Sequence, residues 1–425
     1  MNDCHESILR NLSVPPILTK KDKVFIYEIA LEYIDEYVKE NLLLFYEEDF
    51  HNALYDSLKE YLETLFENMY GLTFLNDCHS IMKEAIRWYF VYIIPMRSNK
   101  HLTKPITNNK ITKLETQINI LRNIPQPQQR SDDWYSFRHN MITASSAWKV
   151  FGSQANMNQL IYEKCKPYMK FSSNVNTESP LHWGQKYEPL SVLLYEKLYE
   201  TQVEDFGCIK DDNHPYLGAS PDGINVDKTS RLYGRMLEIK NIVNREITGI
   251  PKKEYWIQMQ LQMNVCRLNE CDFLETKFVE YDNYQAFIED SDENNKLLTK
   301  NTNKMKGAFL YFNENDVPKY IFPSMDLTFD ELEMWINTTI EKTNLLWVRT
   351  IYWKLDIISC VLVCRNKAWF NSAVKKIADI WSIIEKEKIS GYTHRAPVAR
   401  KTTKPDISNQ SKCLFDNQIL VIKTG

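Results

Sequence analysis

Acidic and basic side chains gather in one short stretch of the sequence, HPYLGASPDGINVDKTSRLYGRMLEIKN, residues 214–241. Asp222 lies in a Pro-Asp-Gly turn, and Glu238 and Lys240 follow further along the stretch. If the segments on either side of the polar residues 227–231 pair as antiparallel strands, the numbers of paired residues add to about 460. Asp222 then lies opposite Glu238. Because side chains alternate along a strand, Glu238 and Lys240 share one face, and Leu237 and Ile239 point into the core.

These three side chains could form a metal site. Two carboxylates can bind Mg²⁺ or Mn²⁺, which prefer oxygen ligands. Such a metal polarises a phosphodiester and helps to generate a nucleophile from water. A neighbouring lysine can orient or deprotonate the water, or stabilise developing negative charge. The alternative is a surface hairpin with a Glu–Lys ion pair and an ordinary turn.

A helix that begins at Ser179 and Pro180 precedes this hairpin in the sequence. Pro189 should kink it just after Glu188, and the kink could direct Glu188 inward. The alternative for Glu188 is a solvated carboxylate on the helix surface.

Two short helices are predicted over residues 130–152, beginning at Ser131 and at Thr143. Trp134 and Arg138 are neighbours on the first of them. Helix N-termini with hydroxyl groups bind phosphate, and an arginine adds a fork of donors. The alternative is a capped helix with a surface arginine.

A further helix is predicted over residues 251–266. Its periodicity places Tyr255, Gln258 and Gln262 on one face and directs Gln260 elsewhere. Amides on one face can hold DNA or a catalytic water. The alternative is the polar face of a packed helix.

The elements around these motifs predict a mixed α/β fold. Residues 21–97 have helical periodicity and indicate an N-terminal helical domain over 1–110, followed by a polar linker over 97–113. Seven of the 11 glycines lie between 152 and 249, within a second domain over 125–385. Strands are predicted at 272–281 and in GAFLYF, KYIFPS and LDIISCVLV. Helices are predicted in FDELEMWINTTIEKTNLLWV and AWFNSAVKKIADIWSIIEKEK, and a basic, mobile tail over 386–425.

Composition limits the class of protein. A net charge of −4 over 425 residues argues against a generally basic nucleic-acid binder, although a local basic groove remains compatible with it. No signal peptide is evident, and the longest apolar runs are too short for a bilayer. We therefore expect a soluble intracellular protein. The nine cysteines fit reduced thiols, and Cys360 and Cys364 are interpreted as buried thiols, with an iron–sulfur cluster as the alternative.

The order of these motifs resembles the PD-(D/E)XK nuclease superfamily. Within it, the chain is similar to the phage-lambda-type alkaline exonucleases, also called YqaJ-like viral recombinases, including versions in large DNA viruses of eukaryotes. The matching segments lie within roughly residues 131–281 and are WYSFRHNMITASS, WGQKYE, GASPDG, LEIK and YWIQMQLQM.

The resemblance implies a restriction-endonuclease-like core and assigns roles to residues. Asp222 and Glu238 would bind Mg²⁺, or Mn²⁺ as the alternative, with help from the carbonyl of Ile239. Glu188 would assist the metal or its water, Lys240 would position or activate that water, and Gln258 would support Lys240 or the DNA. Arg138 and Ser145 would hold a 5′ phosphate. Ser146, Tyr255 and Gln260 are further substrate-binding candidates.

The function that the resemblance implies is a Mg²⁺-dependent 5′–3′ exonuclease that degrades duplex DNA in viral replication, recombination or repair. Its partners would be DNA with a 5′ phosphate and a single-strand annealing protein. It would work in the host cytoplasm or at viral replication sites. Some relatives form ring-shaped trimers, but the N-terminal hundred residues lie outside the family pattern. The alternatives are a structure-specific or single-strand endonuclease of the same fold and a non-catalytic DNA-binding subunit.

Overall fold

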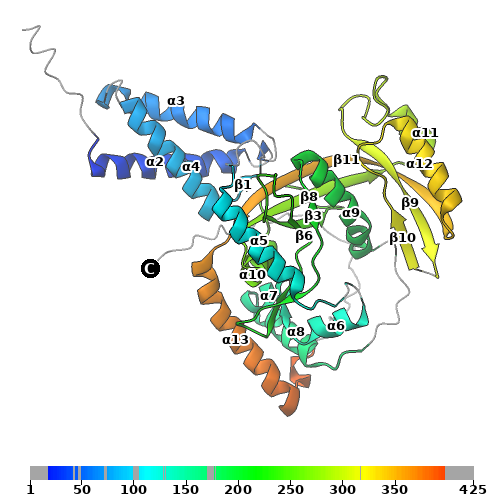
Figure 1. Ribbon diagram of the computed structural model, residues 1–425. Helices are drawn as coiled ribbons and strands as arrows, with labels where there is room; N and C mark the ends of the chain where they lie inside the picture. The colour runs from blue at the N-terminus through cyan, green and yellow to red at the C-terminus, as the bar shows by residue number, and fades with distance from the viewer. Residues whose placement is uncertain are drawn as a thin grey trace, which may run out of the picture.

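The N-terminal part of the chain forms a bundle of helices that projects from one side of the sheet in this computed structural model (Figure 1). The structure describes residues 18–41, 44–45, 49–70, 74–98, 105–127, 129, 131–169, 177, 179–315 and 317–397. Thr19 caps the first helix, since its side chain accepts a hydrogen bond from the Asp22 amide at 3.2 Å. The buried face of that helix repeats every four residues, as the sequence predicts. The bundle comprises α2 (Lys20–Glu40), α3 (Phe50–Tyr70) and α4 (Phe74–Tyr92).

A helix, α5 (Asn108–Asn123), replaces the latter part of the expected linker. Thr107 starts it by accepting a hydrogen bond from the Lys110 amide. The helix is tied to the rest of the chain, because Arg122 binds Glu204 and the Gln117 amide donates to the Cys266 carbonyl at 2.9 Å. The linker prediction is therefore wrong from residue 108 onward, and α5 belongs to the packed core.

The centre of the fold is a mixed sheet with the strand order β10-β9-β11-β8-β7-β6-β3, and β1 pairs with β11. β7 and β8 run parallel, and the other neighbours in this sheet are antiparallel. The expected mixed α/β fold is thus confirmed. The strands are β1 (Met96–Arg97), β3 (Val203–Glu204), β6 (Gly223–Asn225), β7 (Met236–Asn241), β8 (Glu270–Glu280), β9 (Lys306–Glu314), β10 (Val317–Ile321) and β11 (Leu346–Cys364).

The helix predicted in FDELEMWINTTIEKTNLLWV ends earlier in the structure than the sequence analysis expects. The helix α12 (Phe329–Lys342) stops before Leu346, where β11 begins. Leu346 and Trp347 instead pair with β9, and these interstrand hydrogen bonds are long-range contacts that helical periodicity does not reveal. Together, α12, the short helix α11 (Tyr284–Glu289) and the strands β9 and β10 form the right-hand lobe in Figure 1.

Two long helices enclose β7. Leu237 and Ile239 pack with Tyr195 of α9 (Pro180–Tyr199). On the other face, Glu238 contacts Gln258 and Gln262 of α10 (Lys253–Val265). Glu238 is therefore fully buried, although it lies on the polar face of its strand.

A smaller sheet supports the segment that leads into the hairpin. It has the order β2-β5-β4, and β2 runs parallel to β5. Its strands are β2 (Ile142–Thr143), β4 (Ile209–Lys210) and β5 (Leu217–Ala219). The short helices around it, which the sequence predicts in part, are α6 (Asp132–His139), α7 (Ala144–Ala147), the 3₁₀ turn η2 (Trp148–Phe151) and α8 (Gln154–Cys165).

The expected tail boundary at residue 386 falls inside a helix. α13 (Lys367–Ser390) continues through it, and the turn η3 (Thr393–Arg395) follows. Arg395 donates to Glu387 and to Asn158, both at 2.6 Å, so this first tail arginine is fixed to the core. The prediction of a mobile segment is wrong up to Arg395, and residues 398–425 lie outside the described residues. In the described part of the chain, we find no helix whose length and apolarity would let it cross a membrane.

Candidate active site

The hairpin forms in the predicted register. Gly223 pairs with Leu237 and Ile224 pairs with Met236, so the numbers in each pair add to 460. At the next position, the Asp222 carboxylate accepts a hydrogen bond from the Ile239 amide at 2.6 Å. The Asp222 amide donates to the Leu237 carbonyl at 3.2 Å. Both the side chain and the backbone of Asp222 are thereby held against β7.

Glu238 receives hydrogen bonds from three side chains. Its Oε1 accepts from Lys240 Nζ and, at 2.7 Å, from Gln258 Nε2. Its Oε2 accepts from Gln262 Nε2, also at 2.7 Å. Gln258 and Gln262 are one helical turn apart, which confirms the predicted common face of α10. A fully buried carboxylate needs such donors, because an unpaired charge in the protein interior is strongly unfavourable.

Lys240 lies between the two predicted metal-binding groups and an aromatic ring. In addition to Glu238, its Nζ contacts the Ile239 carbonyl oxygen at 3.2 Å. The ring of Tyr255 lies 5.1 Å from the same atom. Tyr255, which was predicted to contact substrate, therefore lines the lysine side of the site.

Burial and neighbouring charges shift the pKa values of Asp222 and Lys240. Burial, followed by repulsion from Glu238, raises the pKa of Asp222 well above its usual value. Burial alone would lower the pKa of Lys240, but the Glu238 and Asp222 carboxylates outweigh it and raise that pKa. Lys240 is thus held protonated by its acidic neighbours.

The residues present fit a divalent cation. Among the described residues, no three His, Cys, Asp or Glu side chains are grouped as a metal cluster. Asp222 and Glu238 nevertheless offer two carboxylates, and the Ile239 carbonyl lies beside them. Mg²⁺ commonly binds one or two carboxylates and keeps several waters. A cation would also offset the repulsion that raises the pKa of Asp222.

Glu188 lies in α9, which reaches the hairpin from the other face of the sheet. Ser179 caps this helix as predicted, accepting from the His182 amide at 3.1 Å. The helix continues through Pro189 to Tyr199, so the proline does not end it. The charge of Glu188 contributes to the raised pKa of Asp222.

Arg138 forms a second group of polar contacts beside the hairpin. Its guanidinium stacks on Trp134, 4.2 Å from the ring centroid, as their helical spacing predicts. It donates to Ser145 Oγ at 3.1 Å and to Ser220 Oγ at 2.9 Å. Since Ser220 precedes Asp222 by two residues, this arginine is linked directly to the hairpin. Ser145 is exposed and can contact a ligand.

Two of the substrate-binding candidates have other contacts. Gln260 is fully buried, where its amide donates to the Cys364 carbonyl and accepts from the Asn366 amide. It joins β11 to α13, away from Glu238, so its assignment to substrate binding is wrong. The Ser146 hydroxyl donates to the Thr143 carbonyl at 3.0 Å and stabilises its own helical turn.

Several residues at the site were not predicted. Gln262 was placed on the correct helical face but was not selected, although it is as close to Glu238 as Gln258. Ser220 stands inside the GASPDG motif and supports Arg138. Lys164 donates to the Arg138 carbonyl at 2.8 Å, and its pKa is lowered to about 8 by burial and by the Arg138 charge. No local pattern marks Lys164, because α8 meets α6 only in the folded chain.

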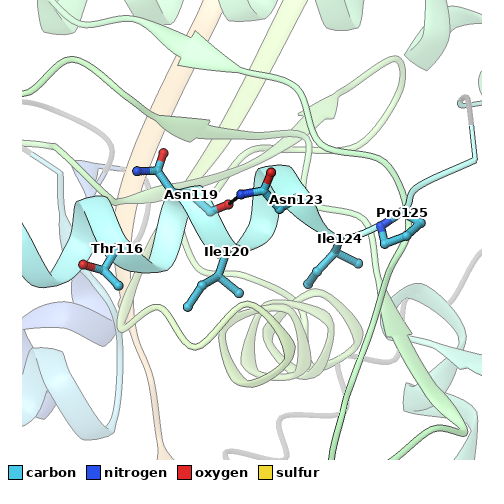
Figure 2. Close-up of a pocket in the computed structure, with 6 residues that line it drawn as sticks. All are labelled: Thr116, Asn119, Ile120, Asn123, Ile124 and Pro125. Carbon is cyan, nitrogen blue, oxygen red and sulfur yellow. Dashed lines mark hydrogen bonds between the residues drawn. The ribbon is translucent and has the colours of Figure 1, made fainter.

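A surface hollow along α5 does not offer comparable chemistry. Figure 2 shows the Asn123 amide bonded to the Asn119 carbonyl, at 2.8 Å, beside the side chain of Ile120. None of the six lining residues is ionisable: they are Thr116, Asn119, Ile120, Asn123, Ile124 and Pro125. This hollow therefore lacks groups for acid–base chemistry.

Comparison with known proteins agrees with the motif analysis. Residues 133–269 match the family described as YqaJ-like viral recombinase domain. A relative in Acanthamoeba polyphaga mimivirus, the uncharacterized protein R354, is 29% identical over 303 residues, which are 63% of this chain and 54% of the relative. This chain thus spans about half the length of that relative.

Two solved structures resemble the chain at lower similarity. The alkaline exonuclease LHK-Exo of Laribacter hongkongensis is 19% identical, with a TM-score of 0.37 over 62% of this chain and 97% of the other. A phage-related exonuclease of Haemophilus somnus 129PT is 13% identical, with a TM-score of 0.31 over 60% of this chain and 96% of the other. The similarity to this family rests on the sequence match, whose limits enclose Arg138, Asp222, Glu238 and Lys240. Residues 133–269 of this chain are thus similar to the YqaJ-like viral recombinase domain.

Proposed function

We propose that this protein is a divalent-metal-dependent nuclease that hydrolyses phosphodiester bonds of duplex DNA from a 5′-phosphorylated end. The observation that carries the proposal is the convergence of Asp222, Glu238 and Lys240 at one end of the hairpin, with both Glu238 oxygens held by amides. A surface hairpin would not need a fully buried carboxylate with three donors.

Each of these residues has a distinct part in the proposed reaction. Asp222, Glu238 and the Ile239 carbonyl would hold Mg²⁺ or Mn²⁺, with Glu188 nearby. The cation would polarise the phosphodiester and lower the pKa of an attacking water. Gln258 and Gln262 keep the Glu238 carboxylate in one orientation. Lys240, protonated beside them, would orient the water or stabilise charge that develops on the phosphate oxygens.

The Arg138 group supports polarity from the 5′ end. Its guanidinium is fixed by stacking and by two serine hydroxyls before any ligand binds. A pre-oriented guanidinium suits a phosphate monoester, which accepts charge-assisted hydrogen bonds from the planar fork. Because Ser220 connects this group to Asp222, an end phosphate bound here would lie close to the metal ligands. Exonuclease action in viral replication, recombination or repair, with a single-strand annealing partner, is the wider role that we propose.

The test uses linear duplex DNA labelled at one 5′ end, with Mg²⁺, and compares the wild type with Lys240→Ala. A parallel substrate carries a 5′ hydroxyl in place of the phosphate. We expect mononucleotides from the phosphorylated end, and a loss of about 10²-fold or more in the variant.

Other results would change the assignment. Internal cuts that do not depend on the end, and that Lys240→Ala abolishes, would make the protein an endonuclease. DNA binding without any cleavage would favour a non-catalytic DNA-binding subunit.

A further inference from the structure

The face of the sheet that carries Glu238 and Lys240 continues along β8. Lys240 pairs with Glu275 of β8, and the two strands run parallel, so these side chains share one face. Because side chains alternate along a strand, Lys277 and Val279 lie on this same face. Val279 in turn pairs with a residue of β11, Lys354, which adds a second lysine beyond the site.

This continuation of the face is accessible, whereas Glu238 is not. α10 covers the first half of β8, where the ring centroids of Tyr255 and Phe273 lie 5.7 Å apart. Further along, Val279 is 37% exposed, although it is an apolar residue in a central strand. Lys240 retains 23% exposure of its side chain and Glu238 none. An open stretch of sheet therefore extends from the lysine side of the candidate site.

The lysines on and beside this stretch outnumber their acidic partners. The Nζ atoms of Lys304 and Lys277 lie 2.9 and 3.3 Å from the two oxygens of one carboxylate, that of Asp356. Lys354 Nζ lies 2.9 Å from Asp290. Three ammonium groups and two carboxylates leave a surplus of positive charge. The side chains of Lys277, Lys304 and Lys354 are 33%, 38% and 32% exposed, so a ligand can reach them.

Phosphate groups are the ligands that this arrangement suits. Ion pairs at the surface contribute little to folding, so stability alone does not explain two lysines on one aspartate. Lysine ammonium groups bind phosphates without distinguishing the bases. The aromatic rings nearby already have partners, since Lys354 lies 5.2 Å from the Tyr281 ring and Phe287 lies 5.0 Å from the Tyr352 ring. Contacts to the backbone of a duplex are therefore favoured over stacking of single-stranded bases.

We propose that three lysines bind the sugar–phosphate backbone of the duplex DNA that has not yet been cut; this lysine track consists of Lys277, Lys304 and Lys354. Along β8, Val279 lies roughly 13 Å beyond Glu275, at about 3.3 Å per residue. Base pairs are spaced by about 3.4 Å, so a duplex whose end lies at Lys240 reaches the track within a few base pairs. This inference rests on the proposed nuclease function and names the surface that holds its substrate.

The experiment measures duplex binding by the full chain with Ca²⁺ in place of Mg²⁺, which separates binding from cleavage. Lys277→Gln, Lys304→Gln, Lys354→Gln and the double variant of the first two are compared with the wild type. Glutamine keeps much of the side-chain length and removes the charge, so all variants should melt close to the wild-type temperature. Fluorescence anisotropy of a labelled duplex gives the affinity over a series of NaCl concentrations.

The salt dependence of binding is the decisive quantity. Each phosphate contact contributes about 0.9 to the slope of log K against log salt concentration. We expect the slope to be shallower by about that amount in each single variant and by about twice that amount in the double variant. Binding at low salt should weaken to the same extent for duplexes of different base sequence.

Lys319→Gln is the matched control. Lys319 is also an exposed lysine paired with a carboxylate, that of Glu314 at 3.1 Å, but it lies on the edge strand β10. This variant should keep the wild-type affinity and slope. Wild-type slopes in every track variant, or an equal change in Lys319→Gln, would overturn the proposal. A loss of affinity confined to single-stranded DNA would overturn it as well.

Cleavage with Mg²⁺ is recorded separately and distinguishes the two failures. If the wild type binds duplex DNA but does not cleave it, the proposed nuclease function fails, and the binding comparison still decides on the track. If the wild type cleaves DNA and the track variants bind it as the wild type does, the nuclease function stands and the track is refuted.

Discussion

Gln262 donates a hydrogen bond to Glu238 Oε2 at 2.7 Å, and this contact joins α10 to the strand that carries the candidate metal ligands. Glu238 has no exposed surface, so no solvent can replace the amide. Gln262 also donates to the Ser220 carbonyl at 3.1 Å, next to the turn that holds Asp222. One amide therefore fixes both strands of the hairpin.

Replacing Gln262 by alanine should impair the site more than the fold. Loss of a hydrogen bond to a buried charge costs about 1–3 kcal/mol, and here the cost falls on the orientation of Glu238. We expect at least a tenfold loss of DNA cleavage in Gln262→Ala, measured below its melting temperature. Gln260→Ala, two residues away, should lower the melting temperature and leave cleavage per folded molecule unchanged. Equal loss of cleavage in both variants would contradict the division of roles.

The Asp222 carboxylate should destabilise the metal-free protein at high pH, although it contributes to metal binding. Its pKa is raised in the metal-free protein, so the folded state retains a proton that the unfolded chain has released. Stability from this group is present at low pH and is lost as pH rises toward the raised pKa. Metal-free Asp222→Asn, which lacks this loss, should melt at a higher temperature than the wild type at pH 8.

Addition of Mg²⁺ should make the wild type melt at a higher temperature than Asp222→Asn. A cation that binds the folded state raises the melting temperature of the wild type, and its binding strengthens with pH because it competes with the proton on Asp222. Asp222→Asn should show little shift. Thermal melts across a Mg²⁺ titration at two pH values measure both effects, and an equal shift in the variant would remove Asp222 from the ligand set.

The adjacent serines 145 and 146 should differ in their effect on the 5′ end. Ser145 contacts Arg138, whereas Ser146 bonds to its own helical turn. We expect Arg138→Ala and Ser145→Ala to slow cleavage of 5′-phosphorylated DNA, by tenfold or more for the arginine, with little effect on 5′-hydroxyl DNA. Ser146→Ala should leave the ratio of the two rates unchanged. Initial rates on the paired substrates provide the measurement, and a variant that slows both substrates alike would place its residue outside the end-binding group.

His51 lies outside the candidate active site and should make the free energy of unfolding depend on pH. The ring accepts a hydrogen bond from the Arg97 amide at 3.0 Å, and burial, followed by the Arg97 charge, lowers its pKa from 6.5 to about 4. Between those values the unfolded chain binds a proton that the folded chain does not, so stability falls as pH drops from 6.5 toward 4. The loss approaches about 3 kcal/mol at 1.36 kcal/mol for each unit of pKa difference.

Denaturant unfolding at pH 7 and pH 4.5 tests this. The difference between the free energies of unfolding at the two pH values should shrink in His51→Gln, whose amide does not titrate in this range. The same difference in wild type and variant would show that other groups cause the pH dependence.

The sequence by itself determined the local features of the site. Period-two alternation and a turn centred near residue 230 set the hairpin register, so that Asp222 meets β7 beside Glu238. Helical periodicity placed Gln258 and Gln262 on one face of α10, and the caps at Ser131 and Ser179 were readable from residue type. Each of these features depends on residues close together in the chain.

Only the tertiary structure decided which faces meet. Helical periodicity separates Gln260 from Gln258 and Gln262, but only packing decides that one face of α10 meets Glu238 and the other meets the β11–α13 junction. In the same way, the contacts of Arg138 with Ser220 and of Asn241 with Gly184 join segments more than 50 residues apart. Such contacts follow from how helices and sheet bury their apolar surfaces together, a global condition that no local pattern contains.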